Sequence, residues 1–440
     1  MHEANEKDYH LTKRTPMNRI TLVICTLAGL LMLSSCKKNS DPNPDQFTVS
    51  ELSTELVAIR NYVPENAVIA HRGSTFWTPE ETEAAYRWAR NMGADYLEAD
   101  LQITSDGVII ALHDVELKRT TNIEEVFPDR AESPASAFTY DELLQLDAGS
   151  WFNEANPEQA REGFVTEKQT ILTLKDLIMI AQGMRLKRNP VTRERIYTKQ
   201  IQEDGSVNYI LEYEVDAQDA GHRPGIYIET KEPSVNPGIE QAVYQELDQL
   251  GWNILTSPAV STSQFITATD GKQKVNVGHT NGKVILQTFS KESMKNLKEQ
   301  FSGQVPTCFL LWLGDGPDDM HNDDSLIYVE FINFGIEQKA VFFGPSISGA
   351  PNNYAELLKP WQADLMHQSK ASIHAYSFDT WVQMDQYYSN TAGSITPNRP
   401  LTDGMFTNRA EMTLEYYFEK GVRPFGSEAT ATETLNYLGY

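Results

Sequence analysis

The sequence alternates short β-rich runs with amphipathic helical segments from residue 67 to residue 420. The predicted strands are 67–71, 96–103, 108–113, 226–231, 284–289, 308–313, 373–378 and 405–407. The predicted helices are 80–92, 140–146, 174–182, 239–250, 291–301, 355–367 and 411–420. Because strands that alternate with helices pair in parallel, this pattern predicts an α/β fold.

One connection does not fit a regular alternation. A short turn with Ser105, Asp106 and Gly107 separates the second and third predicted strands, whereas a parallel crossover needs a dozen residues or more. Asp106-Gly107 is typical of an antiparallel hairpin, so the chain either doubles back here or forms a locally irregular barrel. Three longer stretches are predicted to be insertions that carry loops and small strands: 115–170, 188–225 and 314–338.

The composition is that of a globular protein, with 40% hydrophobic and 10% aromatic residues among 440. The formal net charge of −24, from 37 basic and 61 acidic residues, would repel a phosphate backbone. We therefore expect no nucleic-acid partner. The same field favours divalent cations, but an acidic total more often describes only a solvated surface.

The N-terminal segment resembles a bacterial lipoprotein signal peptide. Lys13, Arg14 and Arg19 precede the apolar run 20–33, which is short for a membrane span, and small residues then lead to Cys36. We expect residues 1–36 to be the signal peptide, with Met17 as an alternative start, and Cys36 to be lipidated. An uncleaved apolar anchor is the other interpretation.

The expected organisation follows from this signal. Residues 37–50, polar and rich in Asn, Asp and Pro, are predicted to form a flexible tether to a single domain over 51–440. This predicts a lipid-anchored protein of the bacterial cell envelope, periplasmic or at the outer membrane or cell surface, whose membrane contact is the lipid. Of the three cysteines only Cys308 falls in the domain, where its apolar neighbours predict a core position and no disulfide is expected.

Two histidines stand at the ends of apolar strands. His71 and Arg72 end the first predicted strand, and His113 follows the apolar stretch 108–112. The carboxyl end of a strand is where barrel enzymes place reactive groups. Taken singly, each histidine could equally cap the core.

Three acidic residues and a lysine also stand near the ends of predicted strands. Glu98 and Asp100 stand two apart in a strand, so both carboxylates share one face with the spacing a bound cation requires. Glu229 and Lys231 share a face in the same way. Taken alone, the first pair could be two solvent-facing acids and the second a buried ion pair. The combination of three acids, two histidines, Arg72 and Lys231 at strand ends instead indicates one site.

These residues form a larger pattern that resembles the glycerophosphodiester phosphodiesterase family. The order and spacing match over His71-Arg72-Gly73, Pro79-Glu80, Glu98-Ala99-Asp100, Asp106-Gly107, His113-Asp114 and Arg119-Thr120-Thr121. A looser similarity continues through Leu146-Asp147-Ala148-Gly149, Thr173-Leu174, Glu229-Thr230-Lys231, Gln287-Thr288-Phe289 and Asp403-Gly404, and so spans about 66–425.

The resemblance implies a TIM-type (β/α)8 barrel with an insertion after the third strand. It also implies one divalent cation, Ca²⁺ or Mg²⁺, held by Glu98, Asp100 and Glu229, and oxygen ligands without a nearby cysteine agree with a hard cation. Catalysis would fall to His71 and His113, one as base and the other as acid. Arg72 and Lys231 would bind the phosphate.

The implied reaction is hydrolysis of a small glycerophosphodiester to an alcohol and glycerol 3-phosphate, by way of a cyclic phosphate. Two alternatives stay open: a related barrel phosphodiesterase that acts on intact lipids, and a non-catalytic lipoprotein that binds ligands at the surface.

The sequence also departs from the family pattern at a few positions. Glu81 replaces an asparagine, Tyr376 a tryptophan, and Asn408 and Ala410 an aspartate and a proline. We expect these residues to lie at the mouth or to support the last strand, and so to affect substrate preference more than activity.

Overall fold

A computed structural model describes residues 42–390, 392–396 and 398–440. The signal peptide, Cys36 and the first part of the tether lie outside this range, so lipidation and envelope location stay predictions that the mass of the mature N-terminus would test. Within the described residues, no helix is long and apolar enough to span a membrane.

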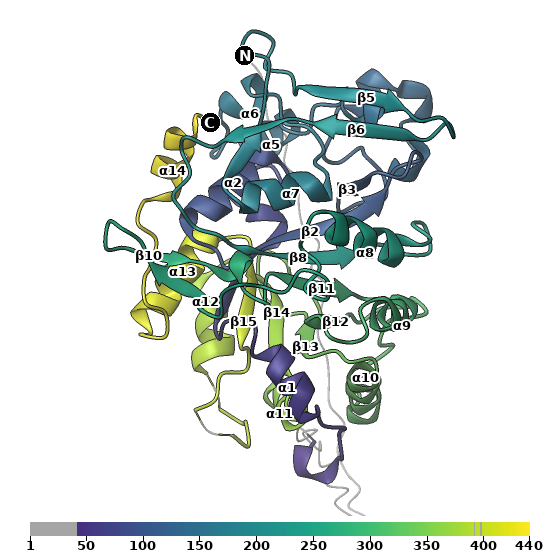
Figure 1. Cartoon of the computed structure of the whole chain (residues 1–440). Helices are drawn as coiled ribbons and strands as arrows, with labels where there is room; N and C mark the ends of the chain where they lie inside the picture. Colours follow the sequence, from purple (N-terminus) through teal and green to yellow (C-terminus); the bar gives the residue numbers. More distant parts are fainter. Residues whose placement is uncertain (1–41, 391, 397) are drawn as a thin grey trace, which may run out of the picture. The chain divides into compact units, whose positions relative to one another are not determined.

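Eight parallel strands close into a barrel, which confirms the predicted fold class (Figure 1). In spatial order they are β1 (Ala67–Ala70), β15 (Gly404–Thr407), β14 (Ser372–Phe378), β13 (Phe342–Pro345), β12 (Thr307–Leu311), β11 (Val284–Thr288), β8 (Gly225–Thr230) and β2 (Tyr96–Ile103). Pairing of Ile69 with Tyr96 and of Ala70 with Leu97 closes the ring between β1 and β2.

The third predicted strand is not part of the ring. Strand β3 (Ile109–Ala111) pairs antiparallel with the end of β2, where Leu101 lies opposite Ala111, so the chain doubles back at the Asp106-Gly107 turn. Gly107 has a φ of +84°, which glycine adopts at little cost. The prediction of eight barrel strands was therefore wrong in one member.

Strand β13 is the member that the prediction missed. It spans only four residues, Phe-Phe-Gly-Pro, and a run so short that ends in Gly and Pro is typical of a turn. The preceding stretch, predicted as an insertion, contains the regular barrel helix α10 (Ser325–Glu337). Apolar residues lie on most sides of α10, so its sequence shows only a weak amphipathic pattern.

Helices surround the barrel and connect its strands (Figure 1). They are α2 (Glu83–Met92), α7 (Leu174–Ala181), α8 (Ile239–Gln249), α9 (Lys291–Gln300), α10, α11 (Pro360–Gln368), α12 (Trp381–Met384) and α13 (Ala410–Glu419), with α1 (Thr54–Arg60) before β1 and α14 (Ala431–Leu438) against α2. Helix α2 begins three residues later than predicted, because Glu81 has a φ of +57° and Thr82 is the N-cap.

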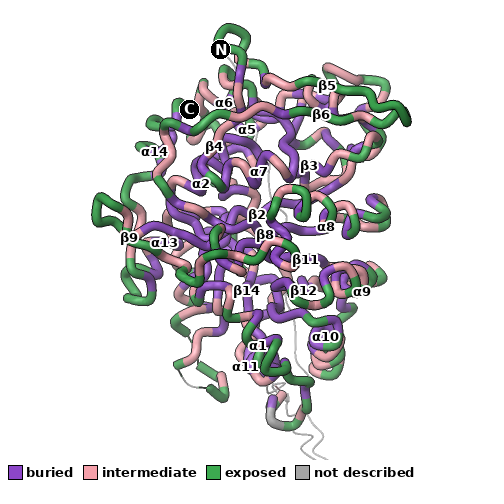
Figure 2. The backbone as a smooth tube through the Cα atoms, viewed as in Figure 1, coloured by how far each residue is buried: buried purple, intermediate pink, exposed green. Residues whose placement is uncertain are grey.

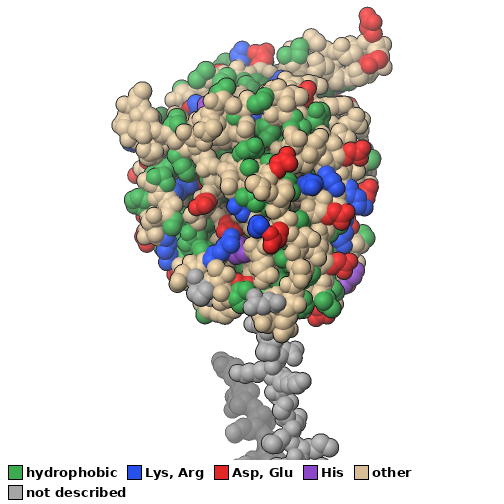
Figure 3. Space-filling view, turned by 60° about the horizontal axis from the view of Figure 1, so that its bottom comes forward, with side chains coloured by type: hydrophobic (Ala, Val, Ile, Leu, Met, Phe, Trp, Pro, Cys, Tyr) green, Lys and Arg blue, Asp and Glu red, His purple; other side chains and the backbone are tan. Residues whose placement is uncertain are grey.

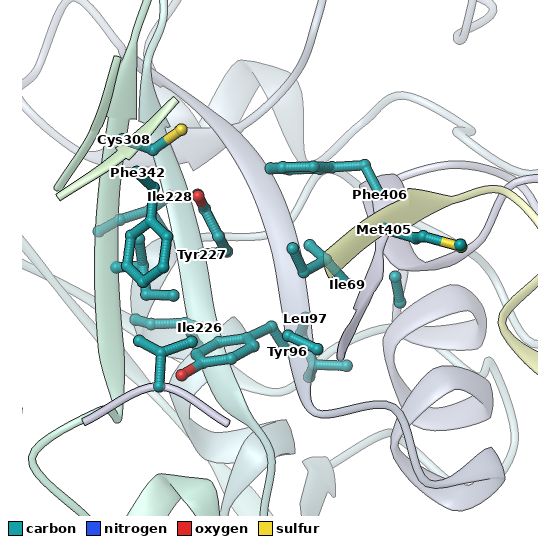
Figure 4. Packing of buried hydrophobic residues seen from close by; sticks show 14 of the residues in the cluster. Ile69, Tyr96, Leu97, Ile226, Tyr227, Ile228, Cys308, Phe342, Met405 and Phe406 are labelled. Carbon is teal, nitrogen blue, oxygen red and sulfur yellow. The ribbon is translucent and has the colours of Figure 1, made fainter. Parts of the chain in front are cut away.

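The strands of the barrel are mostly buried, whereas the outer helices expose one side (Figure 2). Tyr227 and Phe406 meet inside the barrel with ring centroids 4.8 Å apart, and Figure 4 shows their neighbours from several strands. Cys308 is also fully buried, as predicted. On the face that Figure 3 shows, acidic, basic and apolar side chains are interspersed, which is typical of a solvated surface.

The other two predicted insertions do carry short elements. The first holds α3 (Ile123–Val126), α4 (Tyr140–Leu143), α5 (Ser150–Ala155) and α6 (Gly163–Thr166). The second holds the antiparallel pair of β5 (Tyr197–Ile201) with β6 (Val207–Leu211) and also β7 (Tyr213–Val215), which pairs antiparallel with β4 (Met184–Leu186) just before the insertion. A further pair, after the insertion, joins β9 (Phe265–Thr267) to β10 (Gln273–Val275). A second buried apolar cluster, including Ile110, Phe138 and Leu143, joins the first two insertions to β3.

Asp403 joins the last two barrel strands. Its Oδ2 accepts a hydrogen bond of 2.8 Å from the Ile373 N–H and lies 3.0 Å from His367 Nε2. Burial alone would raise the pKa of Asp403, but His367, Arg399 and the Ile373 N–H lower it to about 2. This folded-state pKa lies below the ordinary value of about 3.9, so the charged carboxylate stabilises the fold above pH ~4.

We expect Asp403→Asn to be less stable than wild type at pH 7. The difference should shrink as the pH falls from about 4 towards about 2, because wild type then loses the same charge. Urea unfolding across this range measures the difference, with the exposed Asp129→Asn as control. A gap that does not change with pH would contradict this interpretation.

Candidate active site

All seven predicted site residues line one cavity of about 960 Å³ at the carboxyl ends of the barrel strands. They are His71, Arg72, Glu98, Asp100, His113, Glu229 and Lys231. The structure thus brings together every residue that the sequence pattern singled out, although their roles remain predictions.

The register of two neighbouring strands brings the three acids together. Strand β2 pairs with β8 so that Asp100 lies opposite Glu229, and Glu98 stands two residues earlier on the face of β2 that carries Asp100. All three residues are 5% exposed or less. Burial of three carboxyl groups at adjacent positions is costly unless positive charge balances them.

Two cations give part of that balance. Lys231 Nζ lies 3.3 Å from Glu229 Oε1 and 3.6 Å from Asp100 Oδ1. Arg72 Nε lies 3.3 Å from Asp100 Oδ2, which accepts no hydrogen bond. Asp100 is therefore surrounded by positive charge, and Lys231 lies between the acids of β2 and β8.

The pKa values indicate that this balance is incomplete. Burial, followed by repulsion from Asp100, raises the pKa of Glu98 well above its ordinary value. Burial raises the pKa of Glu229 to about 8, with Asp100 adding to the effect and Lys231 opposing it. Burial would also raise the pKa of Asp100, but Lys231, His113 and Arg72 lower it. The cluster thus holds more carboxyl groups than the nearby cations neutralise.

A tight turn after β1 positions Arg72. Arg72, Gly73 and Ser74 all have positive φ, and the turn aims the Arg72 N–H at Glu98 Oε2, 2.6 Å away. A Cβ on Gly73 would lie 2.6 Å from the Cβ of Ala85, so this position requires glycine. The His-Arg-Gly motif therefore forms a tight turn whose backbone also holds the carboxylate of Glu98.

His71 is held by an amide. Its Nδ1 lies 2.8 Å from Asn408 Oδ1, and Asn408 Nδ2 donates a 2.9 Å hydrogen bond to Asp379. Because Asp379 orients the amide, Asn408 presents oxygen to the ring, so Nδ1 carries the hydrogen and Nε2 keeps its lone pair. Burial, with Arg72 next, lowers the pKa of His71 to about 3, so the ring is neutral near pH 7.

His113 is held by a carboxylate. Its Nδ1 lies 2.6 Å from Asp114 Oδ1, and Asp114 pairs in turn with Arg119. The β2–β3 hairpin returns the chain to the level of the acids, where Leu112 N–H donates to the carbonyl of Asp100. Burial lowers the pKa of His113, while Asp100 and Asp114 oppose that shift. This environment supports the imidazolium form better than that of His71 does.

The donor set fits a hard divalent cation. Glu98, Asp100 and Glu229 offer only oxygen, Asp100 Oδ2 is buried without a hydrogen bond, and Arg72 and Lys231 do not neutralise all the carboxyl groups of the cluster. Among the described residues no three acids, histidines or cysteines already converge as a metal cluster. Lys231 contacts Glu229 Oε1 and Asp100 Oδ1, so a bound cation would share these carboxylates with the lysine.

Several supporting residues were missed or misplaced by the sequence prediction. Glu81 was expected at the mouth or behind the last strand, but it is buried and its Oε1 accepts the Asp100 N–H at 2.7 Å. Asn408 does follow β15, but it contacts His71 directly. Gln287 Nε2 donates to Glu98 Oε1 at 2.9 Å. These contacts had only a weak signal in the sequence. Glu81 follows the Pro79-Glu80 motif, Gln287 begins a family motif, and Asn408 follows the last predicted strand.

An aromatic row on the cavity wall was also missed. Phe289, Tyr376, Tyr354 and Trp312 line the cavity, with successive ring centroids 5.9, 6.1 and 5.6 Å apart. Tyr376 lies in β14 and the other three residues lie in connections far apart in sequence, so no local spacing could have indicated the row.

Comparison with known proteins shows which family the site resembles. Residues 71–242 match the glycerophosphoryl diester phosphodiesterase family. The matched segment contains all seven predicted site residues that line the cavity. Similar relatives include glycerophosphodiester phosphodiesterase of Bacillus subtilis, 31% identical over 244 residues, which cover 55% of this chain and 58% of the relative. Glycerophosphoinositol inositolphosphodiesterase of Mus musculus is 34% identical over 137 residues, 30% of this chain and 25% of the relative.

Structural similarity extends beyond the matched segment. A crystal structure from Silicibacter pomeroyi, assigned to the same family, superposes with a TM-score of 0.51 at 15% identity, covering 84% of this chain and 99% of the other. This likeness concerns the fold alone. The chain spans a little over half of the Bacillus relative and a quarter of the mouse relative.

Proposed function

We propose that the protein hydrolyses glycerophosphodiesters to an alcohol and glycerol 3-phosphate. One observation carries the proposal. Two histidines, each with Nδ1 bound to an oxygen and with no hydrogen bond to Nε2 within the described chain, line one cavity with three clustered carboxyl groups and two cations. The names of the similar proteins point to the same class of substrate.

Glu98, Asp100 and Glu229 would hold one divalent cation, and their flexible carboxylates suit Ca²⁺ as well as Mg²⁺. When bound, such an ion supplies Lewis acidity towards a phosphoryl oxygen and lowers the pKa of a neighbouring hydroxyl. Gln287 and the Arg72 N–H hold the carboxylate of Glu98 from two sides, which orients it for this role.

In the proposed first step His71 is the general base. It is neutral near pH 7, and its Nε2 lone pair takes the proton from the glycerol 2-hydroxyl. The hydroxyl oxygen forms a bond to phosphorus, and the bond from phosphorus to the alcohol oxygen breaks. The products of this step are a cyclic glycerol phosphate and the alcohol.

His113 is the proposed general acid for the same step. The Asp114 carboxylate stabilises its protonated form, so Nε2 can give a proton to the departing alcohol oxygen. The roles then reverse: His113 takes a proton from water, and the water oxygen bonds to phosphorus. The bond from phosphorus to the glycerol 2-oxygen breaks, and His71 returns its proton to that oxygen, which restores the 2-hydroxyl. Arg72 and Lys231 would offset charge on the phosphoryl oxygens.

The alternatives receive less support. An apolar rim would favour an enzyme of intact lipids, but acidic side chains such as Glu232, Glu292 and Asp318 line the outer cavity. The anchored histidines argue against a site that only binds ligands, because binding alone does not require their Nε2 atoms to be free.

The direct test is glycerol 3-phosphate release from glycerophosphocholine by the purified chain. We expect activity with Ca²⁺ or Mg²⁺ that EDTA removes, and a loss of roughly 10²-fold or more in kcat for His71→Ala, His113→Ala and Glu98→Gln. His279→Ala, a histidine outside the cavity, is the matched control and should keep its activity. A folded protein that releases no product from any glycerophosphodiester with either metal would overturn the proposal.

A second test separates the two histidines by leaving group. A p-nitrophenyl ester of glycerol phosphate releases an anion that needs no proton, so His113→Gln should lose less than about tenfold on this ester but roughly 10²-fold on glycerophosphocholine. His71→Ala should be impaired on both substrates. The reverse pattern, measured as kcat for each substrate, would exchange the two roles.

A further inference from the structure

The catalytic groups fill only part of the cavity. Its outer part lies over the ends of β11 to β14 and is bounded by the aromatic row and by the β12–α10 loop, residues 312–320. The glycerol phosphate of the proposed reaction occupies the end with the histidines and cations. The outer part is therefore available to the other alcohol on the phosphate.

The aromatic row has a direction. It begins at Phe289, whose ring centroid lies 5.8 Å from Lys231 Nζ, and ends at Trp312, the first residue of the loop. Tyr376 in the middle is fixed by its hydroxyl, which donates to the carbonyl of Leu311 at 2.7 Å. A group attached to a phosphate at Lys231 would thus extend along aromatic surface towards the loop.

The loop presents acidic side chains at the end of that row. It closes on itself through Met320 N–H to the carbonyl of Trp312, at 2.9 Å. Asp319 is used within the loop, where its Oδ2 accepts the Gly316 N–H at 2.8 Å. Asp318 lines the cavity and has no hydrogen bond or ion pair within the described chain. Its carboxylate is free for a ligand.

The charged side chains of the outer cavity are acidic. Apart from Arg72 and Lys231, its lining contains no lysine or arginine, whereas Glu232, Glu240, Glu292, Asp318 and Asp319 all contribute. Glu240 is only 4% exposed, and its Oε1 has no hydrogen-bond partner in the described chain. A buried, unpaired carboxylate oxygen beside the cavity favours a positively charged ligand there and disfavours an anionic one.

From the aromatic row and the free carboxylates together, we propose that the outer cavity is a subsite for a cationic alcohol, an amino alcohol with a quaternary ammonium group such as choline. This inference rests on the proposed function, whose head group it specifies. Aromatic faces attract a quaternary ammonium, and a nearby carboxylate adds to that attraction. A neutral polyol would gain neither interaction.

The experiment compares kcat/KM for glycerophosphocholine and for the neutral glycerophosphoglycerol, measured with the purified full-length chain. Wild type should prefer the choline diester. Trp312→Leu and Asp318→Asn should each lower kcat/KM for the choline diester about tenfold and for the glycerol diester less than twofold. Asp315→Asn is the matched control, because Asp315 is on the same loop but outside the cavity lining.

Equal effects of Trp312→Leu and Asp318→Asn on both diesters, or no preference in wild type, would overturn the subsite. Calorimetric titration keeps this failure distinct from failure of the catalytic proposal. A chain that hydrolyses neither diester but binds the choline diester more tightly, with the preference lost in Asp318→Asn, would retain the subsite and reject the activity. Equal binding of both diesters would reject the subsite.

Discussion

The site depends on the register between β2 and β8, because that register puts Asp100 opposite Glu229 inside a closed barrel. Three buried carboxyl groups then share a small volume with Lys231 and Arg72, and burial, with repulsion from Asp100, raises the pKa values of Glu98 and Glu229. Such an arrangement is unfavourable for a structural core and suitable for a cation site. The rest of the barrel interior is apolar, as around Tyr227 and Phe406, and its packing offsets the free-energy cost of burying this charge.

The two histidines reach the same cavity by different routes. His71 follows β1 through a turn that only glycine permits at position 73, whereas His113 arrives on a hairpin strand that is not part of the barrel. Their partners differ as well. Burial and the neighbouring Arg72 keep the His71 ring neutral beside the Asn408 amide, whereas the Asp114 carboxylate supports a charged His113. In the proposed mechanism this difference supplies both a base and an acid.

Much of the fold and the site could be predicted from the sequence because the relevant signals are local. Period-two spacing gave Glu98 with Asp100, and seven barrel strands follow from short apolar runs. Strand β13 was missed because Phe-Phe-Gly-Pro is typical of a turn, and α10 because its apolar residues leave no clear polar face. The contacts of Asn408 and the aromatic row join residues distant in sequence. They depend on barrel closure and could not be inferred from local spacing.

Whether the carboxyl cluster binds a divalent cation can be measured by calorimetric titration of the metal-free protein with Ca²⁺ and Mg²⁺. We expect one site in wild type and a loss of that site in Asp100→Asn, while Asp315→Asn on the outer loop binds as wild type does. If wild type binds neither ion, or if Asp100→Asn binds with unchanged affinity, the carboxyl cluster is not a cation site.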